Sequence, residues 1–276
     1  MNQDIPKKLL TTNDPLPFRV LNETGTTPLL LVCDHASNHV PKHLSNLGLD
    51  DQTLQEHVAW DIGSADLAAI ITQQLNCRAV LANYSRLLID VNRNPADNDP
   101  SMIPEISDSY IIPANQDLNS LQKQQRISEI MEPYHRAIEQ QMQALQNYSP
   151  APMLFSIHTF TPAMKGCRKP RPWHAGILWN ADPRIAKPLM KHLRQHDHLL
   201  IGDNEPYSAR EVAYTIDRHG HAHGFPNCAI EIRQDLLKDH ADCLWWGEKL
   251  AEGLKKALDS EDIHCVKYFD LVDDQL

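Results

Sequence analysis

The stretch that decides the fold is Leu29-Leu30-Leu31-Val32-Cys33-Asp34-His35, an apolar run that ends in two ionisable residues. Such a short, uninterrupted apolar run predicts a strand that is buried on both faces. We expect further strands at 79–81, 87–91, 153–157, 176–179, 199–201 and 228–232. We expect helices at 62–75, 183–196 and 241–258, and either one long helix at 117–146 or two helices that are broken near Pro133. Strands that alternate with helices predict an α/β fold, in which helices cover both faces of a mixed, mostly parallel sheet.

The length of the chain, 276 residues, suits one α/β domain. Hydrophobic residues make up 42% of the chain and charged residues 22%, an ordinary globular balance that excludes a disordered or fibrous protein. We therefore expect a single three-layer domain over residues 28–276. The preceding residues 1–27 are polar and rich in turn formers, and we expect them to form a surface segment.

The formal net charge of -10 argues against a nucleic-acid partner, which requires a basic surface. An anionic small-molecule substrate would need a local arginine cluster to reverse the sign of the field at its site. The apolar runs are too short to span a bilayer, and residues 1–8 lack the apolar core of a signal peptide. The six cysteines include no Cys-x-x-Cys pair. We expect a cytoplasmic protein with no membrane partner, and the sequence predicts no oligomeric state.

Side chains that can do chemistry follow the ends of four predicted strands, as Asp34-His35, Asn92-Arg93, His158 and Glu231 to Arg233. In open α/β sheets, ligands bind at the carboxyl ends of the strands. The sequence therefore predicts that these residues converge on one pocket.

A metal site is one interpretation of the histidines in this group. His35 and Asn38 form a His-x-x-Asn turn that can present two ligands on one side, and His158 ends another strand. Zinc takes about four ligands, one of them water in catalytic sites. Asn is a poor zinc ligand, so the carboxylate of Asp61 competes for the third position. The alternative is that these are surface or hydrogen-bonded core histidines, because the chain has fifteen.

Substrate binding is the second interpretation. An Asn92-Arg93 pair offers an amide and a bidentate guanidinium, which suit a carboxylate, and Arg86 adds positive charge. The alternative is that Arg93 pairs with Asp90 or Asp97 within a loop.

Glu231 interrupts an apolar strand, where burial raises the pKa of a carboxyl group toward the range that suits a general base. The alternative is an ion pair with Arg233 or Arg218. Arg233 is also a candidate substrate-binding residue, and His219 is a candidate for polarising a substrate carbonyl, or else a solvent-facing loop histidine. Residues 202–208 form either a substrate-facing loop or an ordinary turn. The sequence has no G-x-S-x-G, G-x-G-x-x-G or Walker A motif, so neither a serine nucleophile nor a nucleotide site is indicated.

Taken in order, these motifs resemble the N-formylglutamate amidohydrolase family. The resemblance covers about residues 28 to 240 and rests on Cys33–Asn38, Trp60–Gly63, Tyr84–Arg93, His158–Phe160, Asp217–Gly220 and Ile230–Leu236. It implies a fold related to zinc carboxypeptidases and aspartoacylase-type deacylases. Those enzymes bind zinc with His-x-x-Glu and a later His, bind the substrate carboxylate with Asn-Arg, and use a late-strand Glu as base.

By this resemblance the metal, expected to be Zn²⁺, is held by His35, position 38 and His158. Asn92-Arg93 is the carboxylate clamp and Glu231 the base. Because Asn38 stands where the carboxypeptidase motif has Glu, the third ligand stays open between Asn38 and Asp61. The implied reaction is hydrolysis of N-formyl-L-glutamate to formate and L-glutamate, a late step of histidine breakdown. The alternatives are carboxypeptidase-like cleavage of a peptide or cell-wall fragment, and a non-catalytic carboxylate-binding domain.

Overall fold

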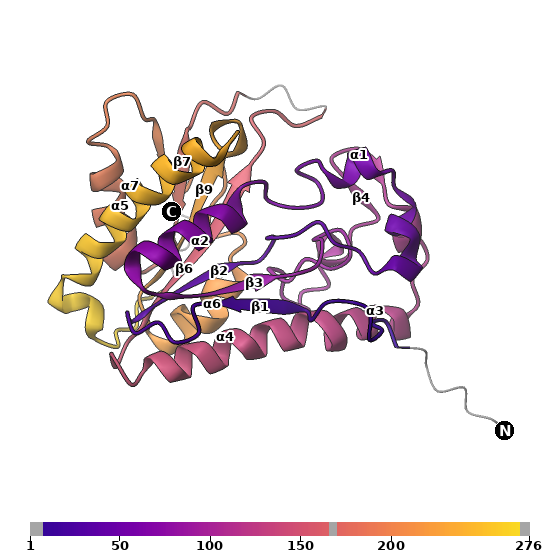
Figure 1. Cartoon of the computed structure of the whole chain (residues 1–276), viewed down its shortest axis with the longest axis horizontal. Helices are drawn as coiled ribbons and strands as arrows, with labels where there is room; N and C mark the ends of the chain where they lie inside the picture. The colour runs from indigo at the N-terminus through magenta and orange to yellow at the C-terminus, as the bar shows by residue number, and fades with distance from the viewer. Residues whose placement is uncertain (1–7, 166–169, 271–276) are drawn as a thin grey trace.

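A seven-stranded sheet forms the centre of the molecule (Figure 1). The structure is a computed structural model that describes residues 8–165 and 170–270. In spatial order the strands are β1 (Phe18–Leu21), β3 (Arg78–Ala82), β2 (Leu29–Cys33), β6 (Met153–Phe160), β9 (Asn227–Arg233), β7 (Ala175–Leu178) and β8 (Ile201–Asp203). The strands β3, β2, β6 and β9 run parallel, β1 and β7 are antiparallel to their inner neighbours, and β8 is parallel to β7. The predicted single α/β domain with a mostly parallel mixed sheet is confirmed.

Helices cover both faces of this sheet (Figure 1). One face carries α4 (Glu132–Leu145) and α6 (Tyr214–His219), and the other carries α2 (Ser64–Leu75), α5 (Pro183–Leu193) and α7 (His240–Leu258). The predicted helix at 117–146 consists of α3 (Ser120–Arg126), a π-helical turn (Ile127–Met131) and α4 in direct succession. Smaller elements are α1 (Asp51–Leu54), the hairpin β4 (Ile106–Ser107) and β5 (Tyr110–Ile111), and 3₁₀ turns at Lys42–Gly48, Pro100–Met102, Pro113–Asn115, His221–His223, Gln234–Leu236 and Glu261–His264.

The apolar run of β2 is uninterrupted because each of its faces meets a different core. Leu29, Leu31 and Cys33 belong to the cluster that includes the apolar residues of α2, α5 and α7. Leu30 and Val32 belong to the cluster that includes those of α4. All five side chains are fully buried, which is the environment expected for a central parallel strand.

The predicted strand at 87–91 is wrong. The carbonyl of Ser85 accepts hydrogen bonds from the backbone N–H groups of Leu88 and Ile89, so this segment closes a turn instead of joining the sheet. Leu87 to Ile89 are nevertheless buried. Their apolar character correctly indicated burial. A strand also needs a neighbouring backbone for hydrogen bonding, whereas here the turn satisfies the backbone N–H groups locally.

The predicted surface segment 1–27 includes part of the sheet, because Phe18–Leu21 form edge strand β1 and pair with β3. Its half-buried side chains explain why the segment shows no strong apolar run. Residues 1–7, which bear on the expectation that a signal peptide is absent, lie outside the described residues. Among the helices of residues 8–165 and 170–270, none is both long and apolar enough to cross a membrane.

Candidate active site

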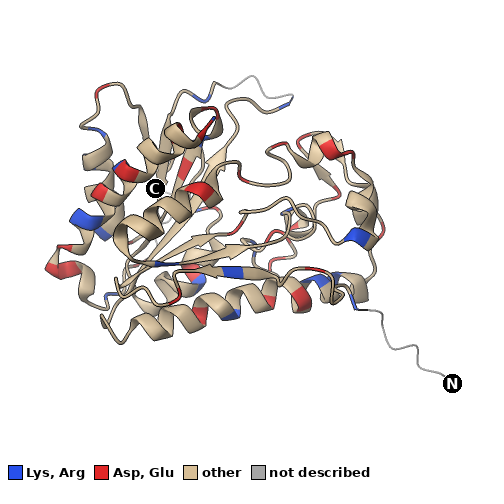
Figure 2. Cartoon of the chain, in the orientation of Figure 1, with Lys and Arg blue, Asp and Glu red and all other residues tan. Residues whose placement is uncertain are grey.

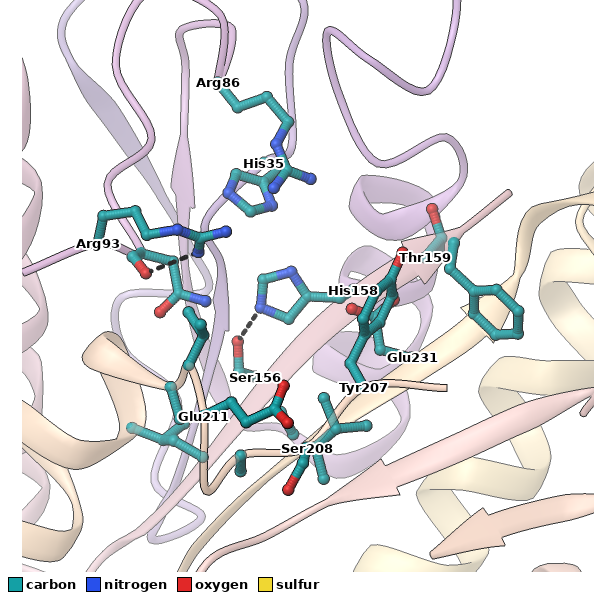
Figure 3. A pocket seen from close by; sticks show the side chains of 18 of the residues that line it. His35, Arg86, Arg93, Ser156, His158, Thr159, Tyr207, Ser208, Glu211 and Glu231 are labelled. Atoms are coloured by element: carbon teal, nitrogen blue, oxygen red, sulfur yellow. Dashed lines mark hydrogen bonds between the residues drawn. The ribbon is translucent and has the colours of Figure 1, made fainter. Parts of the chain in front are cut away.

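A cavity of about 250 Å³ opens at the carboxyl ends of the central strands. Six of the predicted site residues line it: His35, Arg86, Asn92, Arg93, His158 and Glu231. In Figure 3 the two imidazoles lie beside each other, with the two arginines on one side and Glu231 on the other. The convergence expected from the strand ends is therefore present for these residues.

The two histidines lie on either side of a buried carboxylate. His35 follows β2, His158 lies in β6, and Asp61 precedes α2. Oδ2 of Asp61 lies 3.3 Å from Nδ1 of His35 and 2.9 Å from Nδ1 of His158. One ligand atom from each of the three residues lies within 4.8 Å of the others, and all three side chains are buried. This arrangement fits the geometry of a metal site with two imidazoles and one carboxylate.

The far nitrogen of each imidazole faces a second carboxylate. Nε2 of His35 lies 2.7 Å from Oδ1 of Asp90, and Nε2 of His158 lies 3.2 Å from Oδ2 of Asp34. Metal-binding histidines characteristically donate their second N–H to a carboxylate, which leaves the other nitrogen free to bind the metal. The donor set and its surroundings thus fit a divalent metal such as zinc.

These contacts shift the pKa values of both imidazoles. Burial lowers the pKa of His158, but hydrogen bonds with Asp34 and Asp61 outweigh it and hold the pKa well above its ordinary value. Burial and the charge of Arg86 lower the pKa of His35, and the charges of Asp90 and Asp61 reverse the effect and raise it. The surroundings of both imidazoles therefore favour a positive charge, which either a proton or a bound metal cation can supply.

Asn38, the other candidate for the third metal ligand, does not join this group. Its Nδ2 donates a hydrogen bond to the backbone carbonyl of Leu54 at 2.8 Å. Of the two positions left open by the sequence, Asp61 is the one that lies next to both histidines.

Glu231 lies beside His158 because the two residues are register partners on the parallel strands β6 and β9. Partners in register present their side chains on the same face of a sheet. Oε2 of Glu231 is buried and has no hydrogen-bond partner. Burial is the largest cause that raises the pKa of Glu231 to about 7, against the opposing charge of His158. A carboxylate in this state can exchange a proton near neutral pH.

The two arginines bring positive charge to the cavity and are themselves paired with aspartates. Arg86 lies 3.2 Å from Oδ1 of Asp61 and 3.1 Å from Oδ2 of Asp90. Arg93 lies 3.6 Å from Asp90 and 3.2 Å from Asp99, so one of the two aspartate pairings considered from the sequence is present. Figure 2 shows acidic and basic residues interspersed along the chain. Because these charges offset one another at long range, the attraction of an anionic ligand to this site depends on Arg86 and Arg93.

Two predicted substrate-binding residues are not among those that line the cavity. His219 packs in a buried pair with His135, whose Nδ1 lies 2.9 Å from Nε2 of His219. Burial lowers the pKa of His219 to about 3, so the ring is neutral. Arg233 donates to Asp235 at 2.7 Å and to backbone carbonyls of the segment before β7. Both side chains are held by structural contacts that the sequence pattern does not reveal.

Comparison with known proteins settles the family. The sequence profile described as N-formylglutamate amidohydrolase matches residues 27–238. The chain belongs to the N-formylglutamate amidohydrolase family. It is an enzyme, and the reaction class is amide hydrolysis. No curated protein sequence matches this chain significantly.

Two solved structures resemble the enzyme over most of its length. Gene product Atu2144 from Agrobacterium tumefaciens is 30% identical, with a TM-score of 0.86 over 92% of this chain and 100% of that chain. The N-formylglutamate amidohydrolase from Ralstonia eutropha JMP134 is 18% identical, with a TM-score of 0.67 over 88% of this chain and 97% of that chain. The second comparison shows a shared fold.

Further polar side chains of the enzyme line the cavity from loops. Asn92 lines it while its Oδ1 accepts the backbone N–H of Thr215 at 2.9 Å. His57 was not predicted, and its Nε2 lies 3.0 Å from Asp108. Tyr207, from the predicted substrate-facing loop, lies close to Glu231 in Figure 3. The sequence prediction considered polar residues at the ends of strands, and His57 follows no strand, so the pattern did not indicate it.

Proposed function

We propose that this enzyme is a metal-dependent amidohydrolase whose substrate is N-formyl-L-glutamate, which it hydrolyses to formate and L-glutamate. The observation that carries the proposal is the trio His35, Asp61 and His158, with a carboxylate behind each imidazole and Glu231 beside it. The family membership supports formyl as the acyl group of the substrate and glutamate as its amino acid. Such an enzyme would serve histidine breakdown in the cytoplasm.

His35, Asp61 and His158 would hold the metal, for which we propose Zn²⁺. When bound, zinc lowers the pKa of a coordinated water toward about 7 and polarises a substrate carbonyl. Arg86, bonded to both Asp61 and Asp90, offsets the negative charge that these carboxylates concentrate around the histidines. Its role is thus to balance the charge of the site and to keep Asp61 oriented.

Glu231 is the proposed general base. Its unpartnered Oε2 accepts a proton from the attacking water and returns it to the nitrogen of the leaving amino acid. This requires the glutamate to be ionised before the attack and neutral after it. A pKa of about 7 keeps both states accessible near neutral pH.

Arg93 is the proposed clamp for a substrate carboxylate. Its guanidinium reaches the cavity, while Nε donates to Ser101 at 2.7 Å and Nη1 donates to the carbonyl of Asn92 at 3.1 Å. These contacts fix the plane of the guanidinium before substrate arrives, so that less rotational freedom is lost on binding. Binding the carboxylate here would orient the amide toward the histidines and Glu231.

The test combines elemental analysis of the purified enzyme with an assay of formate release from N-formyl-L-glutamate. We expect about one equivalent of zinc per chain, loss of turnover in a chelator and recovery when zinc is restored. N-Formyl-L-leucine and a peptide that ends in glutamate serve as competing substrates. Faster cleavage of the peptide would favour the carboxypeptidase alternative, and full activity of metal-stripped enzyme would contradict metal dependence. Calorimetric binding without turnover would favour a non-catalytic domain.

A further inference from the structure

The carboxylate of Asp34 is a buried centre of hydrogen bonding behind the cavity. Oδ1 accepts from the hydroxyls of Tyr134 and Thr215, each at 2.8 Å. Oδ2 accepts from Oγ of Ser156 at 3.3 Å and lies 3.2 Å from Nε2 of His158. All five side chains are buried, so water does not compete for these bonds. Donors from α4, α6 and β6 thus meet on one residue that follows β2.

The direction of these bonds follows from the chemistry of the groups. An ionised carboxylate only accepts hydrogen bonds, so both hydroxyls must donate their single proton to Asp34. Ser156 gives its single hydroxyl proton to Oδ2 of Asp34, so its oxygen, which lies 2.9 Å from Nε2 of His158, accepts there and Nε2 must carry a proton. Nδ1 lies on the other side of the ring, 2.9 Å from Oδ2 of Asp61, and a metal held by His158 and Asp61 would take the place of the proton between these two atoms. Asp34 therefore fixes the ring of His158 with Nδ1 turned toward Asp61 and away from Asp34.

Thr215 makes a second contact, which connects this centre with the opposite part of the site. Its backbone N–H donates to Oδ1 of Asn92 at 2.9 Å, while its hydroxyl donates to Asp34. Asn92 directly precedes Arg93, the proposed carboxylate clamp. One residue at the start of α6 therefore bonds both to the carboxylate behind His158 and to the loop that carries the clamp.

We propose that Thr215 is a positioning residue, which acts through Asp34 to hold His158 in the orientation that binds the metal. This inference rests on the proposed function, because it takes His158 as a metal ligand. Tyr134 supports Asp34 in the same way from α4. Removing either hydroxyl takes one of two donors from Oδ1 and loosens the carboxylate that fixes His158.

The experiment compares Thr215→Val with Thr215→Ser. Valine matches the shape of threonine and keeps the backbone bond to Asn92, but it lacks the hydroxyl, whereas serine retains the hydroxyl. We measure the Kd for zinc by competition with a chromophoric chelator, which reports on the site without any turnover. We expect a rise of roughly three- to tenfold for Thr215→Val and of about tenfold or more for Asp34→Asn. The Kd of Thr215→Ser should stay within about twofold of the wild type.

A purely structural role for the hydroxyl gives a different result. In that case Thr215→Val would lower the Tm while its Kd for zinc equalled that of the wild type, and the proposal would be overturned. Tyr134→Phe, which removes the other donor to Oδ1, decides the question if Thr215→Val does not fold. Wild-type enzyme that binds no zinc or releases no formate would instead contradict the proposed function itself.

Discussion

Replacing Glu231 by glutamine should make the metal-free protein more stable while it abolishes activity. Glu231 is half-buried, its buried Oε2 lacks a partner, and burial together with the charge of Asp61 raises its pKa from 4.5 to about 7. Glutamine has nearly the same shape and carries no charge. The substitution therefore removes the cost of a buried ionised group together with the proposed base.

The magnitude follows from the pKa shift. Between pH 4.5 and about 7 the unfolded chain ionises Glu231 and the folded protein does not, so stability falls as the pH rises through this window. Each pKa unit corresponds to about 1.4 kcal/mol, which sets an upper value of roughly 3 kcal/mol above pH 7. Because part of the side chain lines an open cavity, we expect about 1 to 3 kcal/mol. Glu231→Gln should equal the wild type near pH 4 and exceed it by this amount at pH 8.

The assay is urea unfolding of both proteins in a chelator at pH 4, 6 and 8, together with formate release by the zinc-loaded forms. We expect kcat to fall by about 10² to 10⁴ in Glu231→Gln. Glu211→Gln is a matched control, because Glu211 lines the same cavity and is exposed. It should change neither the stability nor its dependence on pH. A stability difference between Glu231→Gln and wild type that is the same at all three pH values would refute the reasoning.

Three further predictions concern the metal, the clamp and the buried histidine pair. His35→Asn should reduce bound zinc to near zero by elemental analysis, whereas His57→Asn, at the same cavity, should retain it; equal zinc contents would count against the proposed ligands. Arg93→Lys should raise KM for N-formyl-L-glutamate roughly tenfold or more with unchanged zinc content, because lysine cannot bind a carboxylate through two nitrogens; an unchanged KM in steady-state kinetics would place the clamp elsewhere. Burial lowers the pKa of His135 to about 4, so the wild type should lose stability as pH falls from 6.5 to 4, where only the unfolded chain gains the proton. His135→Gln, which keeps a donor for the carbonyl of Val91, should lose roughly 3 kcal/mol less over this window in urea unfolding, and parallel losses would contradict the assignment.

The alternation of strands and helices could be predicted from the sequence because a buried segment must carry apolar side chains within its own few residues. A central parallel strand such as Leu29–Cys33 needs apolar side chains on both faces, and this requirement is visible in five consecutive residues. The same logic located His35, His158 and Glu231, since a polar residue at the end of such a run has to serve something other than the core. The apolar run at 87–91 shows the limit, because its burial was evident but its turn was not.

Only the tertiary structure determines which side chains form hydrogen bonds or ion pairs with each site residue. Asp34 and Asp90 lie behind His158 and His35 across sequence separations that carry no periodic signal. The sequence pattern left the third ligand position open between Asn38 and Asp61, and it placed His219 and Arg233 with the substrate although neither lines the cavity.

Composition and periodicity determined which segments are buried, in which order they alternate, and which strand ends carry reactive groups. The register of β6 on β9, the turn at Asp34 and His35 and the packing of α4 and α6 determined which of those groups meet. The physical reason is that burial is a property of one segment and its own side chains. Proximity between two side chains depends on how separate segments pair, and no single segment encodes that pairing.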